Sequence, residues 1–437
     1  MNPTRLSVTA ERLALTALTS LLAGCSVDAP VTPLTPAAPR PTAVAMPGVT
    51  VISDSTVLAS FVIPGGGRVL PLVPENVPDR DVATSRVAAT SATLTFTLAA
   101  QVAPPVVSGQ TLQATHIVKS EQWAYVTYAT IGAPTLGAVD VYQIGGNNAK
   151  LMARATFATT EYYAVDTDGS NLYLVGATSD SGFAERAVLD IVSLSGKKLP
   201  NNYLAIRIPL PSYAGTGVSV DGTYVWVTSG SGGPNTGGLS VYAKSNFALL
   251  NRYSFLDARG VHSDGNYVAV MSGTPGTARI YSQSGRGQLG APISIGGATI
   301  AESKGTAWVD ATWAFFAAGD GGTRVVSLAS GGGTIRGSGM VIPSVIGVPA
   351  SLATTNAVFV DVQSNNNGAV LVFTANGEAG VQAYSSNHHG MAVTSTPTIS
   401  YLGRISFGTT ISANFVAGGG GTILIAAGLG GLKILTY

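Results

Sequence analysis

From about residue 111 onward, short runs of β-branched and aromatic residues alternate with Gly-rich turns. Strand-length runs of this kind, bounded by Gly, predict β-strands. The pattern recurs with starts 43 to 56 residues apart. Its seven strongest runs are WAYVTY (123–128), LYLVGA (172–177), YVWVTS (224–229), YVAVMS (267–272), WAFFAA (313–318), AVLVFT (369–374) and TILIAA (422–427).

Each strong run is followed by a partner run that mostly ends in an apolar residue or Tyr, such as AVDVY at 138–142. Weaker runs such as GVSVD precede the strong run, and another, ALLNRYSF at 248–255, follows the partner. Four strands per unit at this period predict an all-β fold, a seven-bladed β-propeller of four-stranded blades over residues 111–437. A β-solenoid would need a shorter repeat and capping units, and neither is evident.

Tight turns separate the first and second strands of several units. The pairs Asp168-Gly169, Asp221-Gly222, Asp264-Gly265 and Asn367-Gly368 favour such turns. Together with Asp310, the recurring aspartates superficially suggest calcium ligands. Their preference for turn positions explains them without a metal, because calcium needs several oxygens converging at one point.

The seventh unit has three strand runs before Tyr437, and an unpaired outer edge there would favour aggregation. We therefore expect an upstream segment within 49–110 to close the ring as its fourth strand. The first candidate is ATLTFTL at 92–98, and the second is residues 49–63. An eighth blade built from 49–110 is the alternative.

Arg5 and Arg12 precede a short apolar stretch that ends in Leu22-Ala23-Gly24-Cys25. This segment resembles the signal peptide and lipobox of bacterial lipoproteins. The resemblance implies removal of residues 1–24 and acylation of Cys25, with palmitate among the attached chains. An ordinary secretory signal is the alternative. Ser26 after the Cys implies the outer membrane if the host is Gram-negative. The Pro-rich residues 25–48 would form an extended tether.

The amino-acid composition excludes several classes of protein. The chain has 437 residues, of which 46% are hydrophobic and 10% charged, with a single Cys. These values exclude a disordered chain and a disulfide scaffold. They also argue against a nucleic-acid binder, because no basic surplus exists to neutralise phosphates. Without residues 1–24 the basic and acidic side chains are equal in number, so membrane attachment must come from acyl chains.

The segments AAGDGGTRVV, ANGEAGVQAY and AAGLGGLKIL resemble the LVIVD-type repeat of bacterial surface β-propellers. The chain lacks the Asp-Val-Ser-Asn-Pro continuation typical of that family. The resemblance implies a propeller in an extracytoplasmic setting and implies no reaction.

No GxSxG, HExxH, Walker or CxxC motif is present, so we predict no catalytic residue, metal site or cofactor. Aligned tight turns place four candidate ligand-binding residues at matching positions on the inner strands. These residues are Asp166, Ser219, His262 and Trp308. The alternative is that they satisfy local backbone groups. His388 and His389 are expected in an exposed turn and are poorly arranged to share a metal.

Loops between second and third strands are long in the first three units, as in ATIGAPTLG, and short in the later ones. We expect this face to bind a partner, because loops carry function on rigid scaffolds. The repeated Tyr142, Tyr242, Tyr281 and Tyr384 are expected to pack between blades. The leading prediction is a lipid-anchored cell-envelope module that binds or scaffolds a protein or glycan. The alternatives are a hydrolase or lyase with a site at the channel mouth, and a structural subunit of a surface layer.

Overall fold

The computed structural model describes residues 39–72, 94–145, 148–230, 237–273, 276–295, 305–310, 312–319, 321–328, 334–340, 354–366, 369–392, 394–408 and 410–437. By its internal contacts the chain divides into Met1–Pro39 and Arg40–Tyr437. The predicted signal peptide, Cys25 and residues 26–38 of the predicted tether lie outside the described residues, whereas residues 39–48 of that tether are described. Within them, no helix has the length and apolar character needed to cross a membrane.

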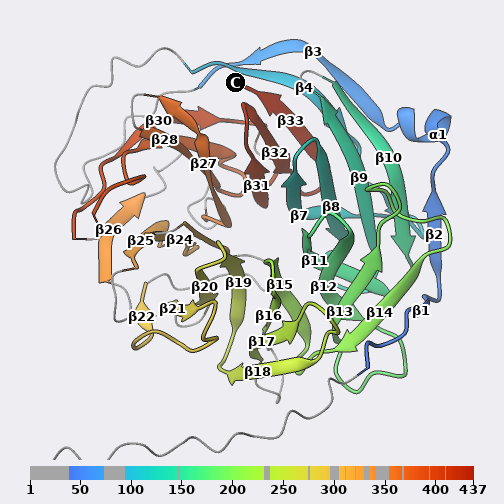
Figure 1. The fold of residues 1–437 in the computed structure, drawn as a ribbon. Coiled ribbons are helices and arrows are strands. Elements are labelled where there is room, and N and C mark those ends of the chain that lie inside the picture. The colour runs from blue at the N-terminus through green and yellow to red at the C-terminus, as the bar shows by residue number, and fades with distance from the viewer. Residues whose placement is uncertain are drawn as a thin grey trace, which may run out of the picture. The chain divides into compact units, whose positions relative to one another are not determined.

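Seven antiparallel sheets of four or five strands are arranged around a common centre (Figure 1), which confirms the seven-bladed β-propeller. Blade 1 contains β7 (Gln113–Ser120), β8 (Trp123–Ala129), β9 (Gly137–Gly145) and β10 (Asn148–Phe157), and blade 2 contains β11 (Thr160–Thr167), β12 (Asn171–Thr178), β13 (Ala187–Ser193) and β14 (Leu204–Pro209). Blade 3 contains β15 (Ala214–Val220), β16 (Tyr224–Gly230), β17 (Gly238–Ala243) and β18 (Leu249–Ser254), and blade 4 contains β19 (Ala258–Ser263), β20 (Tyr267–Ser272), β21 (Thr277–Ser282) and β22 (Ile293–Ser294). Blade 5 contains β23 (Ala307–Val309), β24 (Trp313–Ala317), β25 (Thr323–Ser327) and β26 (Thr334–Met340), and blade 6 contains β27 (Ala357–Asn366), β28 (Ala369–Ala375), β29 (Val381–Ser386) and β30 (Ile399–Ile405).

An N-terminal strand closes the ring. Blade 7 contains β31 (Phe415–Gly418), β32 (Thr422–Ala426), β33 (Leu432–Thr436) and β4 (Phe96–Val102), which pairs antiparallel with β33. The first candidate for this strand, 92–98, is therefore confirmed in place, but the strand begins four residues later. The alternative of an eighth blade built from 49–110 is wrong, since strands β1, β2 and β3 upstream of β4 extend existing sheets.

Those upstream residues form an N-terminal strap, residues 40–70, along the outside of three blades. Its strands β1 (Val44–Ala45), β2 (Val49–Ile52) and β3 (Val62–Leu70) pair with β14, β10 and β4 in turn. The one-turn helix α1 (Ser55–Ala59) lies between β2 and β3, capped by the Asp54 carboxylate. Figure 1 shows the strap in blue outside blades 2, 1 and 7. It covers outer edges that would otherwise offer free backbone groups to another chain.

The core lies between the blades. The described residues contain seven apolar clusters, and each cluster joins the facing sides of two neighbouring sheets. The repeated tyrosines confirm their expected role, because each is buried against the preceding blade. These are Tyr142, Tyr242, Tyr281 and Tyr384. Such packing between alternating faces is what fixes the strand register.

The Gly-rich segments 317–326, 375–384 and 426–435 join neighbouring blades in blades 5 to 7. The first Gly of each segment adopts positive φ and forms a β-bridge with the start of the next blade's inner strand. The bridges join Gly319 to Thr355, Gly377 to Ala413 and Gly428 to Ala114. These short turns therefore connect consecutive blades through backbone pairing, and the last of them connects blade 7 to blade 1.

Candidate functional site

The propeller has two ends. We call the end with the turns between first and second strands (such as 168–170) and between third and fourth strands (such as 194–203) the turn face. The opposite end carries the connections between second and third strands and those between blades. We call it the loop face. The sequence places candidate residues near both.

The four predicted ligand-binding residues occupy the same register position on consecutive inner strands, near the turn face. Their cross-strand partners on the second strand are Tyr173, Trp226, Ala269 and Phe315, for Asp166, Ser219, His262 and Trp308 respectively. The aligned turns therefore placed these residues correctly. In blade 6 the same register position is occupied by Phe359, whose partner on β28 is Phe373.

Three of these side chains accept a hydrogen bond from the backbone of the next blade. The Asp166 carboxylate accepts from the N–H of Val220 at 2.7 Å. The Ser219 hydroxyl accepts from the N–H of Ser263 at 3.0 Å. An open-edge inner strand leaves such N–H groups without a ladder partner, so these side chains satisfy groups that would otherwise be costly to bury.

His262 completes the series. Its Nδ1 accepts from the N–H of Val309 at 3.1 Å, and its ring stacks on Trp308 with 5.9 Å between centroids. His116 accepts similarly from Val165 at 3.4 Å. The candidates therefore form an arc of contacts between blades, and their role toward a ligand stays a prediction.

Burial shifts the pKa values of the titratable side chains in this arc. It raises the pKa of Asp166 to about 7, against the opposing effect of its backbone hydrogen bonds. It lowers the pKa of His262 to about 4 and that of His116 to about 3. Desolvation disfavours the charged form in each case. At neutral pH both histidines are therefore uncharged hydrogen-bond acceptors.

The recurring turn aspartates bind their own turns. The Asp168 carboxylate accepts from the N–H groups of Ser170 and Asn171 at 2.8 and 2.7 Å. Asp221, Asp264 and Asp310 bind the N–H groups two and three residues ahead in the same way. Where the structure describes the chain, no group of three or more His, Cys, Asp or Glu side chains is placed to hold a metal ion.

The expectation that both His388 and His389 lie in an exposed turn is wrong for His388. Its side chain is fully buried, with Nε2 at 3.3 Å from the Asp310 carboxylate and Nδ1 at 2.8 Å from the Ser386 hydroxyl. The packing of blade 6 against Phe315 of blade 5 draws the ring inward. Although Ser, His and Asp are aligned here, Ser386 is 1% exposed, so no substrate reaches its hydroxyl.

A polar cluster lies on the loop face beside the first two long loops. Glu161 accepts from the Thr130 hydroxyl at 3.1 Å and from Tyr163. Arg186 donates to the Tyr213 hydroxyl at 2.8 Å and to Thr178 O at 3.1 Å, and its guanidinium lies over the Tyr213 ring. Burial raises the pKa of Glu161, against opposing hydrogen bonds and the charge of Arg186.

The loop face also carries exposed apolar side chains. Five large ones, each between 42% and 69% exposed, stand on connections of this end, with Val106 in the short strand β5 (Val106–Val107) of one connection. They are Val106, Ile131, Tyr213, Leu256 and Leu429. The polar cluster beside the first two long loops and the apolar side chains of these connections therefore lie on one face. Residues 231–236 of the third long loop lie outside the described residues.

Sequence reasoning missed a second repeated feature, a polar residue in the middle of every third strand. In blade 1, Arg154 forms a bidentate pair with the fully buried Asp140, at 2.7 Å for each bond, and Tyr142 donates to the same carboxylate. Asp190 and Arg207 repeat this pair in blade 2. The sequence does show this feature, because each apolar partner run contains one polar residue. The other members are Ser240, Arg279, Arg324, Gln382 and Lys433.

No protein-family profile and no curated protein matches the sequence. Among solved structures, a virginiamycin B lyase from Staphylococcus aureus has 11% identity and a TM-score of 0.48, over 76% of this chain and 98% of that one. A 6-phosphogluconolactonase-like protein from Bacteroides uniformis has 12% identity and a TM-score of 0.46, over the same shares. A computationally designed protein, Ika8, has 9% identity and a TM-score of 0.42, also over 76% and 98%.

Proposed function

We propose that this chain is a lipid-anchored cell-envelope protein whose propeller binds a protein partner through its loop face. The observation that carries the proposal is the set of exposed apolar tips on that face, Ile131, Tyr213, Leu256 and Leu429 among them. Large exposed apolar patches rimmed by polar side chains mark interaction surfaces, and we infer that these side chains contribute to one. Aromatic and Arg side chains such as Tyr213 and Arg186 are the residue types that dominate binding energy.

The proposed location in the cell envelope is based on the sequence. The lipobox-like Leu22-Ala23-Gly24-Cys25 and the Pro-rich residues 25–39, which precede the strap, support an acylated Cys25 and a tether. The likeness to LVIVD-type surface propellers supports an extracytoplasmic setting. With equal numbers of basic and acidic side chains after residue 24, the propeller itself gains little from anionic lipid, so the acyl chains would supply the anchoring.

An enzymatic role is the second candidate, and one observation favours it. Glu161 is a buried carboxyl with a raised pKa beside Tyr163, on the inner strand of blade 2 at the loop face. A carboxyl of raised pKa beside a second titratable group is a common acid–base arrangement. The site first considered, around Asp166 and His262, is less suited, because the acceptor atoms of both bind backbone N–H groups. A structural subunit of a surface layer would use the same apolar tips against copies of this chain.

A pull-down of the lipidated protein from its own envelope in mild detergent tests the proposal. We expect a stoichiometric protein partner, lost in the triple variant Ile131→Ser, Leu256→Ser and Leu429→Ser. The matched control is the triple variant Val57→Ser, Ile63→Ser and Val69→Ser, whose exposed side chains lie on the N-terminal strap. Retention of the partner by the loop-face variant, or its loss in the strap variant, would overturn the loop face as the binding site.

The same experiment separates the alternatives. Capture of the chain's own copies in place of another protein would favour the surface-layer role. A recovered propeller without a partner would turn attention to catalysis, which the variants Glu161→Gln and Tyr163→Phe would then address. The variant Cys25→Ala tests the anchor by itself, since the unacylated chain is expected to leave the membrane fraction.

A further inference from the structure

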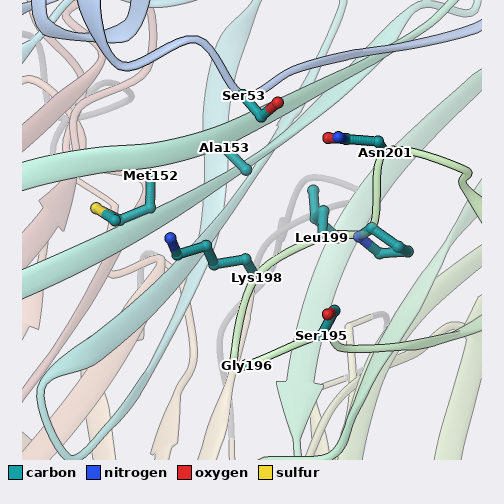
Figure 2. Close-up of a pocket in the computed structure, with 9 residues that line it drawn as sticks. Ser53, Met152, Ala153, Ser195, Gly196, Lys198, Leu199 and Asn201 are labelled. Carbon is teal, nitrogen blue, oxygen red and sulfur yellow. The ribbon is translucent and has the colours of Figure 1, made fainter.

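A hollow of about 410 Å³ lies near the turn face, and none of the candidate site residues considered so far lines it. Three segments form its walls, namely the strap just after β2, the middle of β10, and the connection between β13 and β14. Figure 2 shows its lining side chains arranged around a common space. They are Ser53, Met152, Ala153, Ser195, Gly196, Lys198, Leu199, Pro200 and Asn201.

The connection between β13 and β14 is held in a fixed shape. Ser195 and Lys198 form a two-residue hairpin, with reciprocal backbone hydrogen bonds of 2.9 and 3.1 Å. Gly196 and Lys197 at its tip both have positive φ, as a tight turn of this kind requires. The Tyr125 hydroxyl of blade 1 donates to Lys197 O at 3.0 Å. This wall is therefore preformed, which lowers the entropic cost of binding.

The opposite walls are fixed by strand pairing. Ile52 of β2 pairs with Arg154 of β10, which places Ser53 beside Ala153. Asp54 follows, and its carboxylate caps α1 by accepting from Thr56 and Val57. Met152 is the bulged residue of β10, where the pairing with β9 shifts register. Bulges re-aim a side chain, and Met152 is one of the residues that line the hollow.

The lining has a distinct chemical character. Lys198 is its one charged side chain, no carboxylate lines the space, and Lys198 makes no ion pair with any described residue. Ser53, Ser195 and Asn201 add hydroxyl and amide groups that both donate and accept. Met152, Leu199 and Pro200 supply short apolar surfaces between them. Figure 2 shows Lys198 reaching along one side, with Ser53 and Asn201 across from it.

We propose that this hollow binds an acidic sugar residue of the hexuronate type. The carboxylate of the sugar would pair with the Lys198 ammonium, and its ring hydroxyls would bind Ser53 and Asn201. Its C–H face would pack on Met152 and Leu199. The volume lies within the range of small-ligand sites. A plain alkyl acid would leave the hydroxyl and amide groups unpaired, and a neutral sugar would leave the cation unpaired. This site is separate from the loop face and does not depend on the proposed function.

The test is calorimetric titration of the full chain, carrying Cys25→Ala for solubility, with sodium D-glucuronate. We expect saturable binding at concentrations up to about 10 mM, in the weak range usual for single sugars. Methyl α-D-glucoside tests the carboxylate, and hexanoate and inorganic phosphate test the hydroxyls. We expect each to bind at least about tenfold more weakly than glucuronate.

Variants assign the binding to this hollow. Lys198→Gln and Asn201→Ala are each expected to weaken glucuronate binding about tenfold or more. The matched control is Lys197→Gln, since the Lys197 ammonium lies against Gly169 outside the lining. Circular dichroism checks that each variant is folded. Equal binding by Lys198→Gln and the parent, equal binding of hexanoate or phosphate, or no binding of glucuronate would each overturn the proposal.

Discussion

The carboxylate of Asp166 in blade 2 accepts a 2.7 Å hydrogen bond from the backbone N–H of Val220 in blade 3. The same carboxylate accepts from its own neighbour Thr167 at 2.7 Å. A residue that was predicted to bind a ligand, from the aligned turns of successive repeats, therefore links two sheets. The relationship repeats at Ser219 and His262, so the ring is latched near the turn face by side chains as well as by apolar packing.

Replacing Asp166 with Asn is expected to change how stability depends on pH. Burial raises the pKa of this carboxyl to about 7 in the folded chain. Because the folded state then binds the proton more tightly than the unfolded state, its contribution to stability is full below about pH 4 and declines as the pH rises to about 7. The parent should therefore lose stability relative to Asp166→Asn across this window, by at most about 4 kcal/mol. Urea unfolding at pH 4.5, 5.5 and 7.5 measures it.

The control for this experiment is Asp264→Asn, at a part-exposed turn position where the carboxylate accepts from the N–H groups of Asn266 and Tyr267. We expect its difference from the parent to change little with pH over the same range. A parent and Asp166→Asn pair whose difference in stability is constant from pH 4.5 to 7.5 would contradict the raised pKa.

Replacing His262 with Phe keeps a ring beside Trp308 but removes the acceptor of the Val309 N–H. Leaving that donor unpaired should cost about 1 to 3 kcal/mol in the free energy of unfolding at pH 7. The pKa of His262 is lowered to about 4, so its stabilising contribution is present above about pH 6.5 and declines as the pH falls toward 4. The cost of the substitution should shrink over that interval.

Chemical unfolding at pH 7 and pH 4.5 measures both parts of this prediction. His389→Phe is the matched substitution, because its side chain is 54% exposed. It should change stability by less than about 0.5 kcal/mol. Equal costs for the two substitutions would show that the bond to Val309 contributes nothing.

Removing the buried carboxylate of Asp140 should strongly lower the free energy of unfolding. Asp140→Ala leaves the Arg154 guanidinium buried in blade 1 without its carboxylate, at a cost of about 3 to 5 kcal/mol. Restoring neutrality with Asp140→Ala and Arg154→Met together should recover part of this loss. The measurement is the free energy of unfolding of both single variants and the double variant, as a double-mutant cycle.

Blade 3 offers the matched control, since Ser240 faces Arg252 at the same register position. Arg252 is exposed, so Arg252→Ala should cost less than about 1 kcal/mol. A similar cost for Arg252→Ala and Arg154→Met would mean that burial of the pair does not decide its importance.

Gly380 before the third strand of blade 6 should not tolerate a side chain. It has φ +87°, and an added Cβ would lie 2.1 Å from Ile405 O of the fourth strand. Since backbone must move, Gly380→Ala is expected to cost about 2 kcal/mol or more. Gly390 has φ +77° but open space around it, so Gly390→Ala should cost about 1 kcal/mol. Thermal unfolding of both variants compares them, and equal shifts in midpoint would rule out the steric explanation.

The sequence by itself determined the repeat, the number of blades and the position of the turns. Alternation of short apolar runs with Gly and Asp turns depends on local preferences, and these are visible in single residues. It also identified the segment that closes the ring to within four residues, because the seventh unit lacked a fourth run and 92–98 alternates as a strand. The matching positions of Asp166, Ser219, His262 and Trp308 followed from the same turns.

Only the tertiary structure decided what those side chains touch. Asp166 and Val220 are 54 residues apart, and Asp310 meets His388 only because blades 5 and 6 pack together. The strap on blades 2, 1 and 7, the pairing of Asp140 with Arg154, and the hollow beside Lys198 arise in the same way. Local residue preferences determine where strands and turns form. Contacts between blades depend on how the sheets pack against each other in space, and residues that are neighbours in the sequence do not specify that packing.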